Sequence, residues 1–190
     1  MSNYLDYNAS TPIDPRVLNV MIDAFKNKYG NADSRTHAFG ESARRIVEES
    51  RGNIAELLDI NKDEVFFTSG ATESDNISIL GLQEYAEKFS KKHIITTAIE
   101  HKAVLEPLSV LESKGFEVTY IKPDINGRIN PDEVLSNVRN DTLLVSVMHT
   151  NNETGVIQPI DIIGEALDKT DVFFHVDAAQ SFGKLVDELK

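Results

Sequence analysis

The segment Ser69-Gly70-Ala71-Thr72 is a candidate anion-binding turn. It follows a short apolar run and precedes a stretch of helical periodicity, so it is predicted to connect a strand to a helix. Backbone N–H groups and the positive end of the dipole at a helix start attract phosphate or carboxylate groups. An ordinary turn in which Ser69 or Thr72 caps the helix is the simpler interpretation of these four residues alone. The nucleotide-binding patterns G-x-G-x-x-G and G-x-x-x-x-G-K-[ST] do not occur in the sequence.

Asp177 is a second candidate, because it stands directly after the apolar run 172–176. A buried carboxylate without partners is costly, so this residue requires a cation or hydrogen-bond donors. It could cap the segment that begins at Ala178. It could equally accept a hydrogen bond from a protonated ring nitrogen, the role of an acidic residue beside a pyridinium cofactor. The residue and its neighbours leave both roles open.

Three histidines, His101, His149 and His175, follow or end apolar runs, so a metal site that includes Asp177 has to be considered. His175 and Asp177 are two residues apart and lie on one face of a strand. No H-E-x-x-H motif or other helical pair of ligands accompanies them, so we expect no metal and a packing role for His175. The other polar residues at these strand ends are Glu100, Asn151, Asn152, Glu153 and Gln180, of which Asn151 and Asn152 are also typical of a turn.

These candidate residues all follow strands of a predicted α/β fold. Continuous apolar strands separated by amphipathic helices indicate a largely parallel sheet with helices on both faces. Ligands of such sheets bind beyond the carboxyl ends of the strands, so one polar site is predicted at that edge. The predicted strands are 65–68, 93–97, 116–121, 142–148 and 172–176.

Helices are predicted between these strands, and two helices precede them. Asp14 and Pro15 mark the start of the first helix. We expect the helix that contains Pro107 to begin after about Val104, because proline is tolerated only in the first helical turn. The other predicted helices cover 15–29, 43–58, 72–89 and 131–138, and one more begins at Pro159.

Composition restricts the class of protein. The chain has 190 residues, of which 41% are hydrophobic and 26% charged, as expected for one globular domain or slightly more. Its net charge of −12 argues against nucleic acid as a partner. The sequence shows no membrane-spanning run and no signal peptide, so we expect a cytoplasmic protein without a membrane partner. It contains no cysteine, which excludes a thiol nucleophile within these residues.

Six motifs together resemble one family. The chain is similar from Tyr4 to its last residues to cysteine desulfurases of the NifS/IscS type, pyridoxal-phosphate enzymes of fold type I in the class V aminotransferase superfamily. Class V aminotransferases and selenocysteine lyases remain alternatives within that superfamily. The motifs, in chain order, are YLDYNASTP, GNADSRTHAFG, FFTSGATESDN, ITTAIEHKAV, SVMHTNNETG and FHVDAAQSFGK.

The resemblance implies a role for each end of the cofactor. Ala71 and Thr72 would hold its phosphate, and Asp177 would pair with the protonated pyridine nitrogen. This pairing keeps the ring an electron sink.

The resemblance also implies contacts with the face and the hydroxyl of the ring. His101 would stack on the pyridine ring and assist proton transfer, which makes it the implied catalytic residue. Asn152 and Gln180 would hydrogen-bond the phenolic oxygen.

The implied reaction converts L-cysteine to L-alanine. A protein cysteine receives the sulfur as a persulfide and passes it to a sulfur-acceptor or scaffold protein, for iron–sulfur cluster or thio-nucleoside assembly. The intact family is homodimeric. The family's cofactor-binding lysine, in a Ser-x-His-Lys motif, and its persulfide cysteine would both lie beyond Lys190.

We therefore expect an N-terminal half of such an enzyme. It would be a truncation, a subunit complemented by a C-terminal polypeptide, or a non-catalytic remnant that keeps only the cofactor pocket. Residues 1–60 are assigned to an N-terminal segment with helices that form part of a small domain and cover the cleft. Residues 61–190 are assigned to an incomplete cofactor-binding α/β domain. The family places two later strands between the first and fifth strands, so unpaired strand edges are expected.

Overall fold

The structure is a computed structural model that describes residues 3–190. The chain divides into two units, one that extends to Phe67 and one that comprises Thr68–Leu189. Among the described residues, no helix combines the length and the apolar character that crossing a bilayer requires. The predicted site residues all belong to the second unit.

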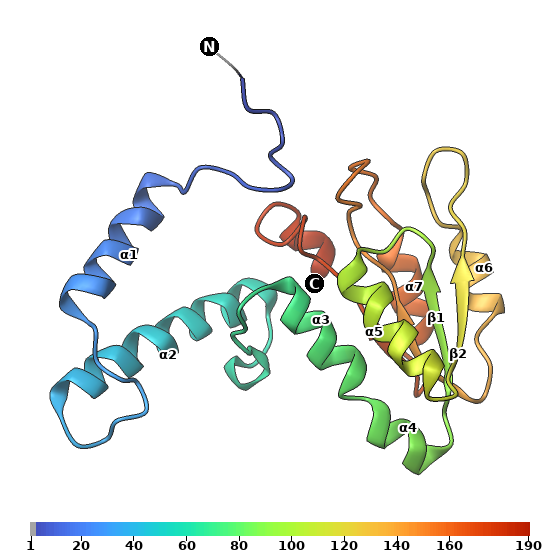
Figure 1. Ribbon diagram of the computed structural model, residues 1–190, viewed down its shortest axis with the longest axis horizontal. Coiled ribbons are helices and arrows are strands. Elements are labelled where there is room, and N and C mark those ends of the chain that lie inside the picture. The colour runs from blue at the N-terminus through green and yellow to red at the C-terminus, as the bar shows by residue number, and fades with distance from the viewer. Residues whose placement is uncertain (1–2) are drawn as a thin grey trace. The chain divides into compact units, whose positions relative to one another are not determined.

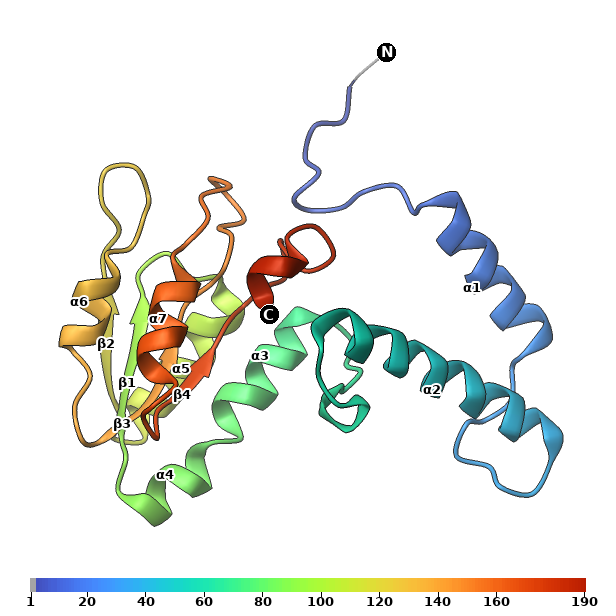
Figure 2. The same cartoon turned by 180° about the vertical axis from the view of Figure 1, so that it is seen from behind.

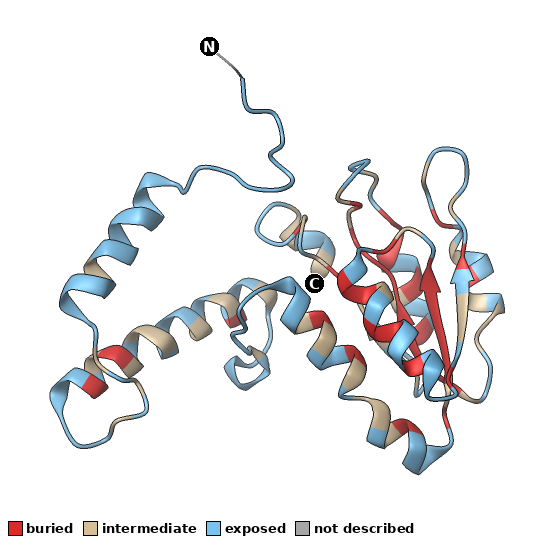
Figure 3. Cartoon of the chain, viewed as in Figure 1, coloured by how far each residue is buried: buried red, intermediate tan, exposed pale blue. Residues whose placement is uncertain are grey.

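Two helices form most of the first unit. Helix α1 covers Pro15–Asn27 and begins as predicted, because the Asp14 carboxylate accepts the N–H of Arg16 at 2.8 Å. Helix α2 covers Ala38–Leu58, and the short helix η1 covers Lys62–Glu64. Few residues of this unit are buried, and α1 has none (Figure 3). Its apolar residues therefore contribute little to a core within the described chain.

The second unit is built on a parallel sheet of four strands in the order β2-β1-β3-β4. Three of the strands have five residues, and the first and third are buried along their whole length. The predicted parallel sheet is therefore confirmed, with four strands rather than five. The strands are β1 (His93–Thr97), β2 (Glu117–Ile121), β3 (Thr142–Ser146) and β4 (Phe173–His175).

Helices cover both faces of this sheet, as Figures 1 and 2 show from opposite sides. Neighbouring strand residues point to opposite faces, so Ile94 and Leu144 join one apolar cluster, whereas Ile95 and Val145 join the other. The first cluster includes residues of α3, α4 and α5, and the second includes residues of α6 and α7. The helices are α3 (Ala71–Leu80), α4 (Gln83–Phe89), α5 (Lys102–Ser113), α6 (Pro131–Ser136), α7 (Ile160–Leu167) and η2 (Val186–Leu189).

The predicted strand 65–68 is wrong for this structure. Val65 has extended backbone angles, but the segment forms no ladder with any strand of the described chain. Its side chains Phe66 and Phe67 are 81% and 51% exposed. The apolar composition predicted a buried strand, but a strand forms only where a neighbouring strand supplies hydrogen-bond partners. No such partner is present among the described residues, so the segment stays exposed.

The single helix predicted at 72–89 is interrupted at Gly81 and Leu82, which separate α3 from α4. The Gly81 N–H bonds the carbonyl of Ile77, and a Cβ added at this glycine would lie 2.5 Å from that carbonyl oxygen. Glycine is therefore the residue that permits this close approach, and the helix changes direction there.

Helix α5 begins at Lys102, earlier than predicted, so Pro107 lies inside it. A proline has no N–H, which leaves the carbonyl of Ala103, four residues earlier, without its usual helical donor. The side-chain amide of Asn76 on α3 supplies a donor, at 3.4 Å from that carbonyl oxygen. The start of α5 was mispredicted because this compensation comes from another helix.

Replacing Asn76 with alanine removes the bond to Ala103 and a second one, from the same amide to the carbonyl of Thr72 at 2.8 Å. It is expected to lower the free energy of unfolding by about 1–2 kcal/mol, the typical contribution of two hydrogen bonds. Denaturant titration measures this change, and Ser78→Ala on an exposed position of the same helix is the matched control. In a Pro107→Ala background, residue 107 can donate to Ala103, so the same substitution should cost less. Equal costs in the two backgrounds would show that Asn76 does not compensate for the proline.

Candidate active site

The turn before α3 leaves the start of that helix open. Gly70 occupies the cap position, and within the described residues no side-chain capping hydrogen bond is made to the N–H groups of the first turn. The interpretation in which Ser69 or Thr72 caps the helix is therefore wrong. The Glu73 carboxylate instead accepts the N–H of Ser69 at 2.5 Å, and this bond lowers the pKa of Glu73. Ala71 and Thr72, both exposed, thus present helix-start N–H groups that are able to bind an anion.

Asp177 is buried just beyond the end of β4, with 8% of its surface exposed. One carboxylate oxygen accepts the N–H of Ala179 at 2.9 Å, so the residue does cap the turn that follows. Burial raises the pKa of Asp177, and the charge of Asp75 raises it further, whereas His175 and His101 lower it. A cation at this carboxylate would offset the cost of burial, so capping and cofactor binding are compatible roles.

His175, at the end of β4 and two residues before Asp177, connects that strand to β3 and α3. One ring nitrogen lies 2.8 Å from the Ser146 hydroxyl on β3, and the other lies 3.4 Å from the Asp75 carboxylate on α3. Both nitrogens therefore have protein partners, as expected for a packed histidine. Asp75 is itself buried, and in the described part of the chain its second carboxylate oxygen has no hydrogen-bond partner.

His149 is also buried, and both of its ring nitrogens contact other side chains. Its two ring nitrogens lie 2.9 Å from the Ser181 hydroxyl and 3.1 Å from the Glu188 carboxylate. No group of three potential ligands within residues 3–190 is arranged to hold a metal ion.

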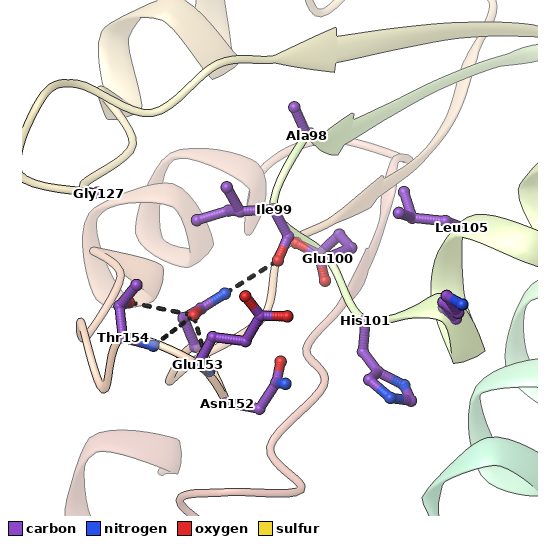
Figure 4. Close-up of a pocket in the computed structure, with 11 residues that line it drawn as sticks. Ala98, Ile99, Glu100, His101, Leu105, Gly127, Asn152, Glu153 and Thr154 are labelled. Atoms are coloured by element: carbon purple, nitrogen blue, oxygen red, sulfur yellow. Dashed lines mark hydrogen bonds between the residues drawn. The ribbon is translucent and has the colours of Figure 1, made fainter.

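His101 and Asn152 line one pocket of about 480 Å³ at the carboxyl edge of the sheet (Figure 4). His101 is exposed and caps α5: its Nδ1 atom accepts the N–H of Ala103 at 3.1 Å. The neutral ring consequently carries its proton on Nε2. Asn152 belongs to the hairpin that follows β3, between Asn151 and the glycine at position 155, which has a positive φ of 72°.

Glu100 is a buried acid in the wall of the same pocket. Its Oε1 atom accepts hydrogen bonds from the Thr97 hydroxyl at 2.6 Å and the Met148 N–H at 2.9 Å. The Oε2 atom has no hydrogen-bond partner among residues 3–190. Burial raises the pKa of Glu100 to about 7, against the effect of these two hydrogen bonds. The carboxyl group is thus protonated through most of the mildly acidic range.

The six predicted site residues all belong to the second unit, but only two of them line the pocket of Figure 4. His101 and Asn152 share the pocket of Figure 4, and the His101 charge acts on Asp177. Gln180 lies in the turn that Asp177 caps. Asp75, one helical turn after Ala71 on α3, connects that helix to His175 and influences Asp177. Asp75 was not predicted as a site residue, because it stands in the polar run 72–76, where nothing in the local sequence indicates that it is buried.

Comparisons with known proteins give one consistent result. A family model described as aminotransferase class-V matches residues 3–189. Cysteine desulfurase IscS of Stutzerimonas stutzeri (strain A1501) is 52% identical over 98% of this chain and 46% of its own length. The mitochondrial cysteine desulfurase of Candida maltosa is 47% identical over 96% of this chain and 37% of its own length. The chain therefore spans about half the length, or less, of these curated relatives.

Solved structures agree with these matches. The crystal structure of DndA from Streptomyces lividans superimposes with a TM-score of 0.89 at 49% identity, over 98% of this chain and 52% of that one. The structure described as SspA in complex with cysteine gives a TM-score of 0.92 at 40% identity, over 99% of this chain and 55% of that one.

Proposed function

Because the chain belongs to the class-V aminotransferase family, we propose that it carries the cofactor-binding part of a pyridoxal-phosphate-dependent cysteine desulfurase. The observation that supports this most strongly is that an open helix start at Ala71 and a buried acid at Asp177 belong to one unit, in which α3 contacts the end of β4 through Asp75 and His175. The similar proteins named as cysteine desulfurases favour this activity over the others found in the family.

The residues of the proposed site fit the chemical groups of pyridoxal phosphate. The uncapped N–H groups of Ala71 and Thr72 complement a phosphate. The buried Asp177 carboxyl complements a protonated ring nitrogen, since it has a raised pKa that a cation would lower. When bound, this cofactor supplies a ring that delocalises negative charge from the α-carbon of an amino acid.

Three other residues act on the ring in this proposal. His101 lies against the ring face and holds a proton at Nε2, because its Nδ1 atom is engaged by Ala103. His101 can donate that proton to a leaving group of the substrate. Asn152 and Gln180 donate side-chain N–H groups to the phenolic oxygen and so orient the ring.

The proposed substrate is L-cysteine. Its C–S bond breaks, an S–S bond forms on an accepting protein thiolate, and the carbon skeleton leaves as L-alanine after it gains a proton. Because the 190 residues contain no cysteine, that thiolate belongs to a residue outside them, and we propose the same for the cofactor-binding lysine. Homodimer formation, sulfur delivery to an acceptor or scaffold protein, and a cytoplasmic location complete the proposal.

The test uses the protein as it is naturally encoded, with pyridoxal phosphate, L-cysteine and a thiol reductant. We expect saturable cofactor binding and the formation of alanine and sulfide in equal amounts. L-Serine, which has no thiol, is the matched substrate control and should yield no alanine.

Each other outcome identifies an alternative. Failure to bind pyridoxal phosphate would contradict the proposal. Cofactor binding without alanine formation would identify a non-catalytic protein that keeps only the pocket. Turnover of L-selenocysteine but not of L-cysteine would identify a lyase of the same family.

A further inference from the structure

His101 and Asn152 are carried by two loops that follow neighbouring strands. The loop 98–101 follows β1, and the hairpin 149–158 follows β3. The last residue pair of the β1–β3 ladder is Thr96 with Ser146. Beyond that pair, the backbone ladder no longer fixes the distance between the two loops. Other contacts must therefore hold His101 and Asn152 in place.

Glu100 provides one connection between these loops. Its Oε1 atom accepts the Thr97 hydroxyl within its own loop and the N–H of Met148, 48 residues later, on the other side. Only 6% of its surface is exposed. A carboxyl group placed directly before His101 thus attaches that loop to the chain that leads into the hairpin.

Asn151 provides the second connection. Its Nδ2 atom donates to the carbonyl of Ile99, 52 residues earlier, at 3.0 Å (dashed in Figure 4). Its Oδ1 atom accepts the N–H groups of Glu153 and Thr154 at 3.0 and 2.9 Å, which fixes the turn around Asn152. Both ends of the Asn151 amide are thus used within the protein, so Asn151 organises the turn and leaves ligand contact to its neighbour.

Each connection is made by the residue directly before a proposed ring-binding residue, and neither is needed to form one loop alone. A local turn requires only the bonds of Asn151 Oδ1. The Ile99 and Met148 bonds cross from one loop to the other. The hydrogen bonds of these two buried side chains therefore hold the two loops at a fixed distance from each other.

We propose that Glu100 and Asn151 are positioning residues that set the spacing between His101 and Asn152 for pyridoxal phosphate. The proposal rests on the proposed function, because it assumes that these two residues contact the cofactor. Small displacements of binding groups weaken binding strongly. Loss of either connection should therefore reduce cofactor affinity even where the fold persists.

The experiment measures pyridoxal phosphate affinity by equilibrium dialysis, with the visible circular dichroism of the bound cofactor and the melting temperature of the cofactor-free protein. It uses the naturally encoded protein and the variants Asn151→Ala, Glu100→Ala and Glu100→Gln. We expect both alanine variants to bind at least about ten-fold more weakly, with reduced dichroism at saturation. Glu100→Gln keeps the acceptor oxygen, so its affinity should stay within about three-fold of the unsubstituted protein.

Asn137→Ala is the control, because that amide, at the end of α6, donates to the carbonyl of Glu133 in the same helix. It should leave affinity and dichroism unchanged. If the alanine variants do not fold, Thr97→Val removes only the hydroxyl that bonds Glu100 and should still weaken binding by at least about three-fold. Unchanged affinity in the folded variants would overturn this inference and leave the proposed function standing. Failure of the unsubstituted protein to bind would instead overturn the proposed function, and this inference with it.

Discussion

Replacing Asp177 with asparagine is expected to weaken pyridoxal phosphate binding by about 10²–10⁴-fold, with a comparable loss of alanine formation. Asp177 is buried, so a bound pyridinium nitrogen would form a buried ion pair with it. Removal of one partner of such a pair typically costs about 3–5 kcal/mol. Asparagine keeps an acceptor for the N–H of Ala179, so the turn after β4 should remain folded. Cofactor affinity from equilibrium dialysis measures the effect.

The matched control for this substitution is Asp132→Asn. Asp132 is an exposed acid in the first turn of α6, and its replacement removes the same charge away from the site. It should leave cofactor affinity unchanged. If Asp177→Asn binds the cofactor as tightly as the unsubstituted protein does, Asp177 does not contact the ring nitrogen.

Glu100 should make the protein less stable as the pH rises from 4.5 to about 7. Burial raises its pKa in the folded protein from 4.5 to about 7, with a smaller contribution from the charge of Asp177 and an opposite one from His175. In this interval the unfolded chain releases the proton and the folded chain keeps it, so each rise in pH favours unfolding. The loss amounts to about 3 kcal/mol and is complete above about pH 7.

The comparison with Glu100→Gln isolates this effect from the other titrating groups. Glutamine has no charge at any pH, so the variant should gain about 3 kcal/mol relative to the unsubstituted protein between pH 4.5 and pH 7. Urea titrations at several pH values give the two free energies of unfolding. A difference between the two proteins that stays constant with pH would show that Glu100 ionises in the folded state as it does in water.

The sheet was predictable because four of the predicted apolar runs form its strands, and the two central ones are buried along their whole length. Strands β1 and β3 lie between two apolar clusters, so side chains on both of their faces are buried. Their sequences are therefore largely continuous apolar runs and do not alternate between apolar and polar residues. The run 65–68 has the same composition and no partner strand in the described chain. Composition reports the tendency to be buried, whereas strand formation depends on a partner distant in sequence.

For the candidate site, the position of the residues was predictable from the sequence, but the contacts between them were not. The rule that ligands bind beyond the carboxyl ends of strands placed Asp177, His101 and Asn152 at one edge. The contacts between them were not predictable, because Asn151 reaches Ile99 across 52 residues and Asn76 reaches Ala103 across 27. Hydrogen bonds between side chains and distant backbone leave no local pattern in a sequence.

The central claim is that one pyridoxal phosphate molecule spans the distance from the turn before α3 to the acid after β4. A crystal structure of the naturally encoded protein with pyridoxal phosphate tests it most directly. We expect the phosphate against the N–H groups of Ala71 and Thr72 and the ring nitrogen within hydrogen-bond distance of the Asp177 carboxylate. A cofactor that contacts only one of these two places, or neither, would contradict the account.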